Sequence, residues 1–164
     1  MVVKEILNRR SVRDFSPDPV GDDLINEIIQ AAQLAPTAMN NKSLEFIIIK
    51  DREIKEKIFK EVGQDFVRQA SVLIIPAVDI QKSTLPVQDI SLATENIFLQ
   101  ATALGLGTVW KNLTDQWAKK VKLLLGVPKN YLLINIIPVG WPNKPLPPHS
   151  RSEFDIRKIH FEKW

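Results

Sequence analysis

The sequence predicts one α+β or α/β domain built from two or three layers. Helical and strand-type hydrophobic patterns alternate along the 164 residues, and no repeat, low-complexity tract or linker interrupts them. A hydrophobic content of 45% is ample for one core. Hydrophobic pattern alone does not set the strand order, so the prediction stops at the layers.

A first long helix is expected after Asp22 or Asp23, either of which can cap it, and Pro36 ends it. The short isoleucine-rich run 44–49 that follows is best read as a buried strand. The apolar positions of the helix fall on one face and are Leu24, Ile25, Ile28, Ile29 and Ala32.

A second helix runs from its predicted cap, Asp51, through Val62. The apolar run 72–78 is a second core strand. Pro76 within it predicts a bulge or an unpaired position, because proline has no amide hydrogen to donate. The inward-facing positions of this helix are Ile54, Ile58 and Val62.

The stretch 88–104 is the most informative helix. Two apolar stripes run along it, so it must be buried on more than one side. In so small a protein this indicates that a second subunit covers it as well as its own sheet. Gly105 is well placed to end it, since glycine accepts the left-handed conformation. The stripes are Ile90, Ala93, Ile97, Ala101 and Leu104, and Leu92, Leu99 and Ala103.

A further helix is expected after its cap, Thr114, and is closed by Gly126 and Pro128. The run 132–139 is a third buried strand. The apolar positions of the helix are Trp117, Val121, Leu124 and Leu125.

The end of the chain is proline-rich over 142–148 and should run extended. It then carries apolar residues that need a surface to cover them. We interpret 142–164 as an arm that embraces a second subunit. A tail folded back on its own subunit is the alternative. The apolar residues are Ile156, Ile159, Phe161 and Trp164.

Composition excludes several classes of protein. With 22 basic and 19 acidic residues the charge is +3, which suits local anion binding better than a nucleic-acid surface. No apolar run could span a bilayer and the first residues do not open a secretory signal, so no membrane partner is expected. The absence of cysteine excludes disulfides and thiolate metal sites and is compatible with a cytoplasmic location.

Arg9, Arg10, Ser11 and Arg13 form the first candidate site. Arginine offers a rigid fork of donors that meets two phosphate oxygens at once, and a serine hydroxyl adds a third contact. These groups could hold a phosphate monoester while the next arginine reaches a neighbouring polar group. The spacing equally allows a solvated basic turn after a short helix.

Two further segments could contact a flat heterocycle. The small-residue loop 35–41 offers exposed amides and the Asn40 side chain. In 104–110, two glycines allow a close approach and Trp110 offers a stacking surface. Each segment is also explained as a plain connection between a helix and a strand. The glycine pattern is incomplete and follows a helix, which excludes a Rossmann fingerprint.

Other chemistries lack their residues. His149 and His160 have no metal-ligand partner at helical spacing, so no metal site is expected. No nucleophile elbow and no Walker-type loop is present. Asp89, Glu95 and Glu153 are expected on helical or arm surfaces, solvated or paired rather than catalytic.

The order of these motifs resembles the nitroreductase family of FMN-dependent oxidoreductases over essentially the whole chain. The opening motif and the glycine segment are the specific part, and the other landmarks support them by spacing. The landmarks are Arg9-Arg10-Ser11-Val12-Arg13-Asp14-Phe15, Ala35-Pro36-Thr37-Ala38-Met39-Asn40, Asp89, the helix 93–103, Gly105-Leu106-Gly107-Thr108-Val109-Trp110, Pro138-Val139-Gly140-Trp141-Pro142, and Arg151 ahead of Ile159-His160-Phe161.

The resemblance implies an α+β fold with three α/β/α layers and a mixed, mostly antiparallel sheet. Residues 1–164 would form one FMN-binding domain, with the arm 142–164 lying on the partner of a homodimer. NADH or NADPH would donate hydride, and a nitroaromatic, quinone or flavin acceptor would follow by a ping-pong mechanism. No side chain is needed as acid or base, so no catalytic residue is assigned.

The resemblance also implies the FMN contacts, at two interface sites. Carried over by position, Arg9, Arg10, Ser11 and Arg151 would bind the phosphate, and Arg13 would lie by the pyrimidine edge of the flavin, where a cation stabilises the reduced ring. Pro36, Thr37, Ala38 and Asn40 would come from the partner subunit, and Thr108, Val109, Trp110 and Asn112 would line the ring near its reactive nitrogen.

The chain departs from the family at Lys42-Ser43-Leu44, where glutamine, proline and an aromatic are common. It is also short, so an insertion that some members use as a pocket lid is missing. We therefore expect a shallow, permissive substrate pocket. Two alternatives remain: an FMN-binding member with an oxygen-dependent or dehydrogenation reaction, and a non-enzymatic module that binds phosphate or nucleic acid.

Overall fold

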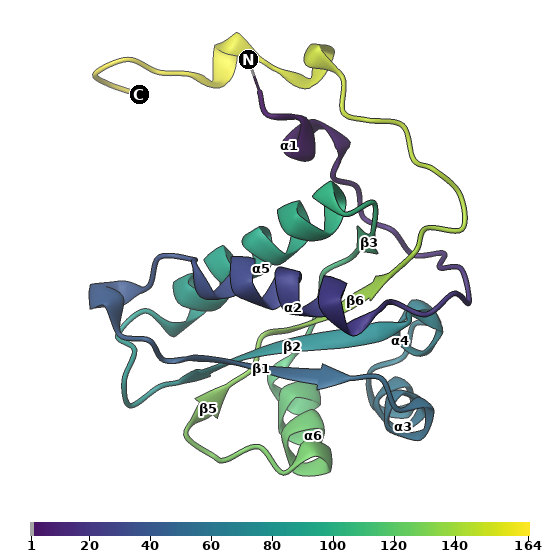
Figure 1. The fold of residues 1–164 in the computed structure, drawn as a ribbon. Helices are drawn as coiled ribbons and strands as arrows, with labels where there is room; N and C mark the ends of the chain where they lie inside the picture. Colours follow the sequence, from purple (N-terminus) through teal and green to yellow (C-terminus); the bar gives the residue numbers. More distant parts are fainter. Residues whose placement is uncertain (1) are drawn as a thin grey trace.

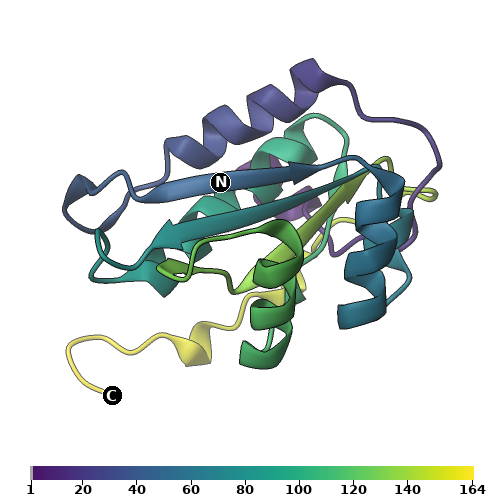
Figure 2. The same ribbon diagram turned by 90° about the horizontal axis from the view of Figure 1, so that it is seen from below.

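A β-sheet lies between two layers of helices (Figures 1 and 2) in a computed structural model that describes residues 2–164. Helices α2 (Asp22–Gln33) and α5 (Pro86–Ala103) cover one face of the sheet. Helices α3 (Arg52–Val62), α4 (Phe66–Gln69) and α6 (Asp115–Leu125) cover the other. The predicted α+β class with three layers is confirmed.

Every ladder between the strands is antiparallel. The strand order is β1-β2-β6-β3, with β4 paired to β6 and β5 paired to β2. Within residues 2–164, the parallel pairing that is recorded is the single bridge between Ser11 and Thr108. The strands are β1 (Leu44–Ile49), β2 (Val72–Asp79), β3 (Gly107–Thr108), β4 (Lys111–Asn112), β5 (Tyr131–Leu132) and β6 (Asn135–Gly140).

Strand β2 runs through the centre of the core, and all eight of its residues are buried. Successive side chains of a strand point to opposite faces of the sheet. Val72 and Ile74 accordingly pack with α2 and α5, whereas Leu73 and Ile75 pack with α3, α4 and α6. A strand that is covered on both faces needs an unbroken apolar run, which is the pattern that predicted it.

Pro76 does not disturb the pairing of β2 with β1, where the register is continuous over all six residues of β1. On the other side, the ladder to β6 ends at Ile74 and the ladder to β5 begins at Val78. Pro76 lies in this gap, so the predicted unpaired position is confirmed. The same gap corrects the prediction of one strand over 132–139, which is split into β5 and β6.

The helix caps confirm two predictions and correct a third. The side chains of Asp51 and Thr114 accept hydrogen bonds from the amides three residues on, at 2.8 and 3.3 Å. Neither Asp22 nor Asp23 caps α2, because both lie inside its first turn and Gly21 is the cap residue. Carboxylates in a first turn still stabilise a helix through its dipole.

Helix α5 turns one apolar stripe to the core and leaves the other at the surface. Ile90, Ile97 and Ala101 are fully buried, whereas Leu92 is 46% exposed. The short helix α1 (Lys4–Asn8) packs on α5 and leaves its own Ile6 exposed. Part of the second predicted stripe is therefore uncovered within this subunit.

The segment after β6 leaves the body of the molecule (Figure 1). It is extended over the prolines and then forms two short 3-10 turns, η2 (Arg151–Glu153) and η3 (Ile156–Lys158). Phe154, Phe161 and Trp164 on it are exposed. Among the helices of residues 2–164, none has the length and apolar character that a bilayer crossing requires.

Lys55 fastens α3 to the start of β2. Its Nζ is buried and donates to the carbonyl oxygens of Ala70 at 2.7 Å and Ser71 at 3.1 Å. Burial lowers the pKa of Lys55, and the nearby Asp51 carboxylate partly opposes this.

Lys55→Met is expected to lower the free energy of unfolding by about 1–3 kcal/mol, because two carbonyl oxygens lose their donor. Urea denaturation measures the change. Lys57→Met, on the exposed side of the same helix, is the matched control and should stay within about 0.5 kcal/mol of the unmodified protein. Equal destabilisation by both substitutions would contradict this role.

Candidate functional site

The arginine segment 9–13 and the glycine segment 104–110 lie side by side. After α1 the chain runs along β3, where Ser11 forms its bridge with Thr108 and the amide of Val12 donates to the carbonyl oxygen of Thr108 at 2.9 Å. These residues are almost one hundred positions apart in sequence. The arginine segment and the segment that begins at Thr108 therefore form one surface.

This surface contains a hollow of about 360 Å³, which we call the basic hollow. Arg9 and Arg10 are half-buried there, and Ser11 and Arg13 are exposed. The four residues are thus gathered around one concavity rather than spread over a convex turn. The hollow is lined by Arg9, Arg10, Ser11, Arg13, Leu146 and His149.

Both half-buried arginines have partners within the chain. The Nε of Arg9 lies 3.6 Å from a carboxylate oxygen of Glu95 on α5. The Nη1 of Arg10 donates to the carbonyl oxygen of Pro147 at 2.5 Å. Arg10 thereby ties the proline-rich segment to the basic hollow. Each guanidinium has five N–H donors, so these single contacts leave further donors for an anion.

The glycines of the 104–110 segment are explained by contacts inside the protein. Gly105 has a φ of +77° and ends α5, as predicted. A Cβ on Gly107 would lie 2.6–2.8 Å from three side-chain carbons of Val12. Glycine is therefore required at position 107 for the arginine segment to lie against β3.

The four predicted flavin neighbours that follow Gly107 differ in what they present. Thr108 and Val109 are buried, so Val109 could reach a ligand only through its backbone. Trp110 is half-buried and lies edge-to-face against Phe98, with 6.5 Å between the ring centroids. Asn112 is exposed on β4.

Residues 37–41 lie at the other end of α5. A 3-10 turn, η1 (Ala38–Asn40), forms there, and a hollow of about 330 Å³ is lined by Thr37 and Asn40 together with Lys42. Thr108 follows the last turn of α5, whereas the 37–41 loop is bound to its first turn. An 18-residue helix is roughly 27 Å long. The loop and the Ser11–Thr108 bridge are therefore separated within one subunit (Figure 1).

Asp89 binds this loop to α5. Its carboxylate accepts hydrogen bonds from the amide of Ala38 at 2.8 Å, from Nδ2 of Asn41 at 2.9 Å and from Oγ of Ser83 at 2.6 Å. Burial by itself raises the pKa of Asp89, but these three bonds outweigh it and the pKa is lowered.

Asp89 was expected on a surface and is instead 1% exposed. Neither Asn41 nor Ser83 was predicted to have a role. One signal was available, since an aspartate in the first turn of an otherwise apolar helix needs donors once the helix is buried. Of the other two predicted surface carboxylates, Glu95 pairs with Arg9 and Glu153 accepts from the amide of Ser150, so both are paired as expected.

Two predicted contacts remain, Arg151 and Pro36. The side chain of Arg151 lies outside the described part of the structure. Pro36 is exposed just before the 37–41 loop.

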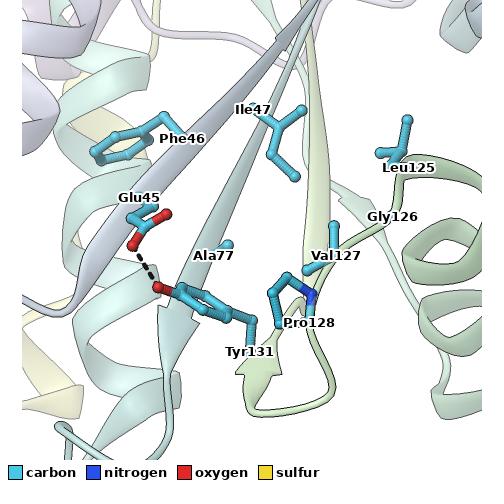
Figure 3. Close-up of a pocket in the computed structure, with 9 residues that line it drawn as sticks. All are labelled: Glu45, Phe46, Ile47, Ala77, Leu125, Gly126, Val127, Pro128 and Tyr131. Atoms are coloured by element: carbon cyan, nitrogen blue, oxygen red, sulfur yellow. Dashed lines mark hydrogen bonds between the residues drawn. The ribbon is translucent and has the colours of Figure 1, made fainter.

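A separate hollow of about 270 Å³ lies between β1, β5 and the end of α6 (Figure 3). The hydroxyl of Tyr131 donates to the Glu45 carboxylate at its rim, and this bond is the main cause that raises the pKa of Tyr131 to about 12. None of the predicted site residues lines this hollow. It is therefore not part of the candidate site.

Comparison with known proteins gives the family. The model of the nitroreductase family matches residues 6–63 and 57–141. Proteins from Archaeoglobus fulgidus and Methanothermobacter thermautotrophicus, both provisionally named NADH dehydrogenase/NAD(P)H nitroreductase, are 36% and 35% identical over 99% of this chain. The matches cover 98% and 87% of those proteins. The structure of an FMN-dependent nitroreductase from Clostridium difficile matches with a TM-score of 0.92 and 28% identity over 98% of both chains. The chain belongs to the nitroreductase family.

Proposed function

We propose that the protein is an FMN-dependent oxidoreductase that uses NADH or NADPH as its hydride donor. The observation that carries this proposal is the basic hollow, where three arginines and a serine lie beside the segment that begins at Thr108. Membership of the nitroreductase family supports the same cofactor, as does the FMN dependence stated for the Clostridium difficile relative.

The residues of the basic hollow fit the phosphate of FMN. Guanidinium and hydroxyl donors are the groups that bind a phosphate monoester most strongly. When bound, FMN would supply the hydride-accepting chemistry. Arg13 is exposed, and its recorded hydrogen bond, to the carbonyl oxygen of Ser11, is long at 3.5 Å. Its charge is therefore available to the pyrimidine edge of the flavin.

A homodimer accounts for the separation of the two candidate segments. The 37–41 loop and the Ser11–Thr108 bridge lie at opposite ends of α5, so one flavin would meet both segments only where two subunits adjoin. The exposed Leu92 on α5 and the exposed Ile6 of α1 offer an apolar surface for that contact. The arm 142–164, with its exposed aromatic residues, would lie on the partner.

The electron acceptor would follow the oxidised nucleotide to the same face of the flavin, in a ping-pong sequence. Nitroaromatics, quinones and free flavin are the acceptor classes we propose. The side chains supply position and charge, and we assign no catalytic residue. The cytoplasmic location expected from the cysteine-free sequence stays a prediction.

An anaerobic visible spectrum tests the proposal. The purified protein is mixed with FMN, desalted, and titrated with NADH and separately with NADPH, and its size is measured by gel filtration. We expect a dimer that retains absorbance near roughly 450 nm, and bleaching by at least one nucleotide.

Each other outcome has a distinct meaning. Retained colour that neither nucleotide bleaches would keep the FMN site and favour an oxygen-dependent or dehydrogenation reaction. No retained flavin would overturn the proposal and leave the basic hollow as an anion-binding or solvated surface.

A further inference from the structure

Asp89 is part of a closed ring of hydrogen bonds. Asp89 accepts hydrogen bonds from Asn41 and Ser83. The amide of Ser43 in turn donates to Oδ1 of Asn41 at 2.9 Å. The amide of Asp79 donates to the carbonyl oxygen of Ser43 at 3.2 Å, and the amide of Ser83 donates to the carbonyl oxygen of Asp79 at 3.1 Å. The ring joins the loop before β1, the turn after β2 and the first turn of α5.

Four of the five residues of the ring are buried and Asn41 is half-buried, which makes the bonds of the ring costly to lose. Asp89 is 1% exposed, Ser43 is 2% exposed, and Asp79 and Ser83 are each 6% exposed. A buried polar group that loses its partner keeps its full desolvation penalty. The ring therefore holds the loop before β1, the turn after β2 and the first turn of α5 in a fixed arrangement.

The loop held by this ring has unfavourable backbone dihedral angles. Met39, Asn40 and Lys42 have φ values of +54°, +52° and +50°. Residues other than glycine adopt this left-handed region at a cost in free energy, smallest for asparagine, which their surroundings must offset. The contacts that can impose it are the bond from Ala38 to Asp89 and the bonds of Asn41 to Asp89 and Ser43.

We propose that Asp89 is a positioning residue for the flavin, holding residues 37–41 of one subunit in the conformation that meets the heterocycle of the FMN bound by the other. This inference rests on the proposed function. Asp89 itself would touch no flavin atom, because it is buried behind the loop.

The chemistry of the site requires a carboxylate at position 89. Three donors converge on its two oxygens, and a carboxylate has acceptors only. An asparagine of almost the same size would place an NH2 group against one of these donors. The hydrogen bond from Ala38 or the one from Asn41 would then be lost.

Ser43 fixes the orientation of Asn41. Because the Ser43 amide donates to Oδ1 of Asn41, the NH2 group of Asn41 is directed at Asp89. A proline at position 43 would have no such donor. Ser43 thus helps to hold the loop through its backbone amide.

Flavin binding by Asp89→Asn is the test. Dissociation constants for FMN and for riboflavin are measured by fluorescence titration, together with the visible spectrum of the bound flavin and the melting temperature. We expect the dissociation constants of both flavins to rise about tenfold or more and by the same factor, with a changed visible band. Equal factors are expected because both ligands carry the heterocycle and only FMN carries the phosphate.

Asp51→Ala is the matched control, because it removes the N-cap of α3 on the opposite face of the sheet. It should lower the melting temperature while leaving both dissociation constants and the visible band unchanged. Ser83→Ala removes one of the three bonds to Asp89 and serves if Asp89→Asn does not fold. It should raise both constants by a smaller common factor.

Three results would overturn the inference. The first is an unchanged FMN constant in a folded Asp89→Asn protein, or in Ser83→Ala where the former does not fold. The second is weaker binding of FMN with unchanged binding of riboflavin, which would mean that the loop contacts the phosphate rather than the heterocycle. The third is an equal loss of flavin affinity in Asp51→Ala, which would make the effect one of general stability. An unmodified protein that binds no FMN would refute the proposed function as well, so the two failures are distinguishable.

Discussion

Alanine at Arg9 or at Arg10 is expected to weaken FMN binding by about 1.5–3 kcal/mol in each variant, because each would remove a charge-assisted bond to the phosphate. This corresponds to roughly 10-fold to 150-fold in the dissociation constant. Fluorescence titration of the flavin-free protein measures it. Riboflavin binding should change far less, since riboflavin lacks the phosphate.

Arg10 requires a further control, because it also holds the carbonyl oxygen of Pro147. Loss of that bond could release the arm 142–164 and reduce the dimer, so gel filtration accompanies the titration. Arg52→Ala, at an exposed position on the opposite face of the sheet, removes the same charge and should leave FMN binding unchanged. Unaltered FMN affinity in both Arg9→Ala and Arg10→Ala would contradict the phosphate assignment.

Gly107→Ala is expected to lower the free energy of unfolding by about 1–3 kcal/mol and to weaken FMN binding in parallel. The added Cβ would lie 2.6–2.8 Å from three carbons of Val12, and the β-branched Val12 side chain cannot rotate all of them away. The arginine segment would have to move off β3. Urea denaturation and the flavin titration measure the two effects.

Two comparison variants make the Gly107 result specific. Gly21→Ala adds the same methyl group where no atom lies within 4 Å and φ is −65°, so only a modest loss of capping is expected. Adding Val12→Ala to Gly107→Ala removes the two Cγ atoms of Val12 that clash with the new Cβ. The double variant should regain part of the lost flavin affinity. If Gly107→Ala binds FMN as tightly as the unmodified protein, the close contact does not hold the arginine segment in place.

The elements that were predicted well are those whose signal is local. The strand β1 has the predicted bounds, and Asp51 and Thr114 cap α3 and α6 through amides only three residues away. Gly105 ends α5 for the same kind of reason. An N-cap, a helix stop and an apolar run are each completed within a few residues, so the sequence contains the whole interaction.

Apart from the cap of α2, which lies one residue before Asp22, the predictions that were wrong depended on distant partners. The run 132–139 is apolar at every position except Asn135, and it is split because β2 pairs with β5 and β6 as two separate ladders. Asp89 looked like a surface residue because two of its three donors, Ala38 and Asn41, are about fifty positions away. The hydrophobic pattern does not predict which polar groups will form hydrogen bonds with one another.

The sequence by itself determined the order of the candidate motifs and, through their resemblance, the family and its three-layer α+β class. Only the tertiary structure decided that Ser11 lies on Thr108, that Gly107 is glycine because of Val12, and that the 37–41 loop is fastened to the opposite end of α5 from that bridge. The physical reason is the range of the forces involved. Helix and strand preferences act between near neighbours, whereas burial and hydrogen bonding select among partners that only the folded chain brings into contact.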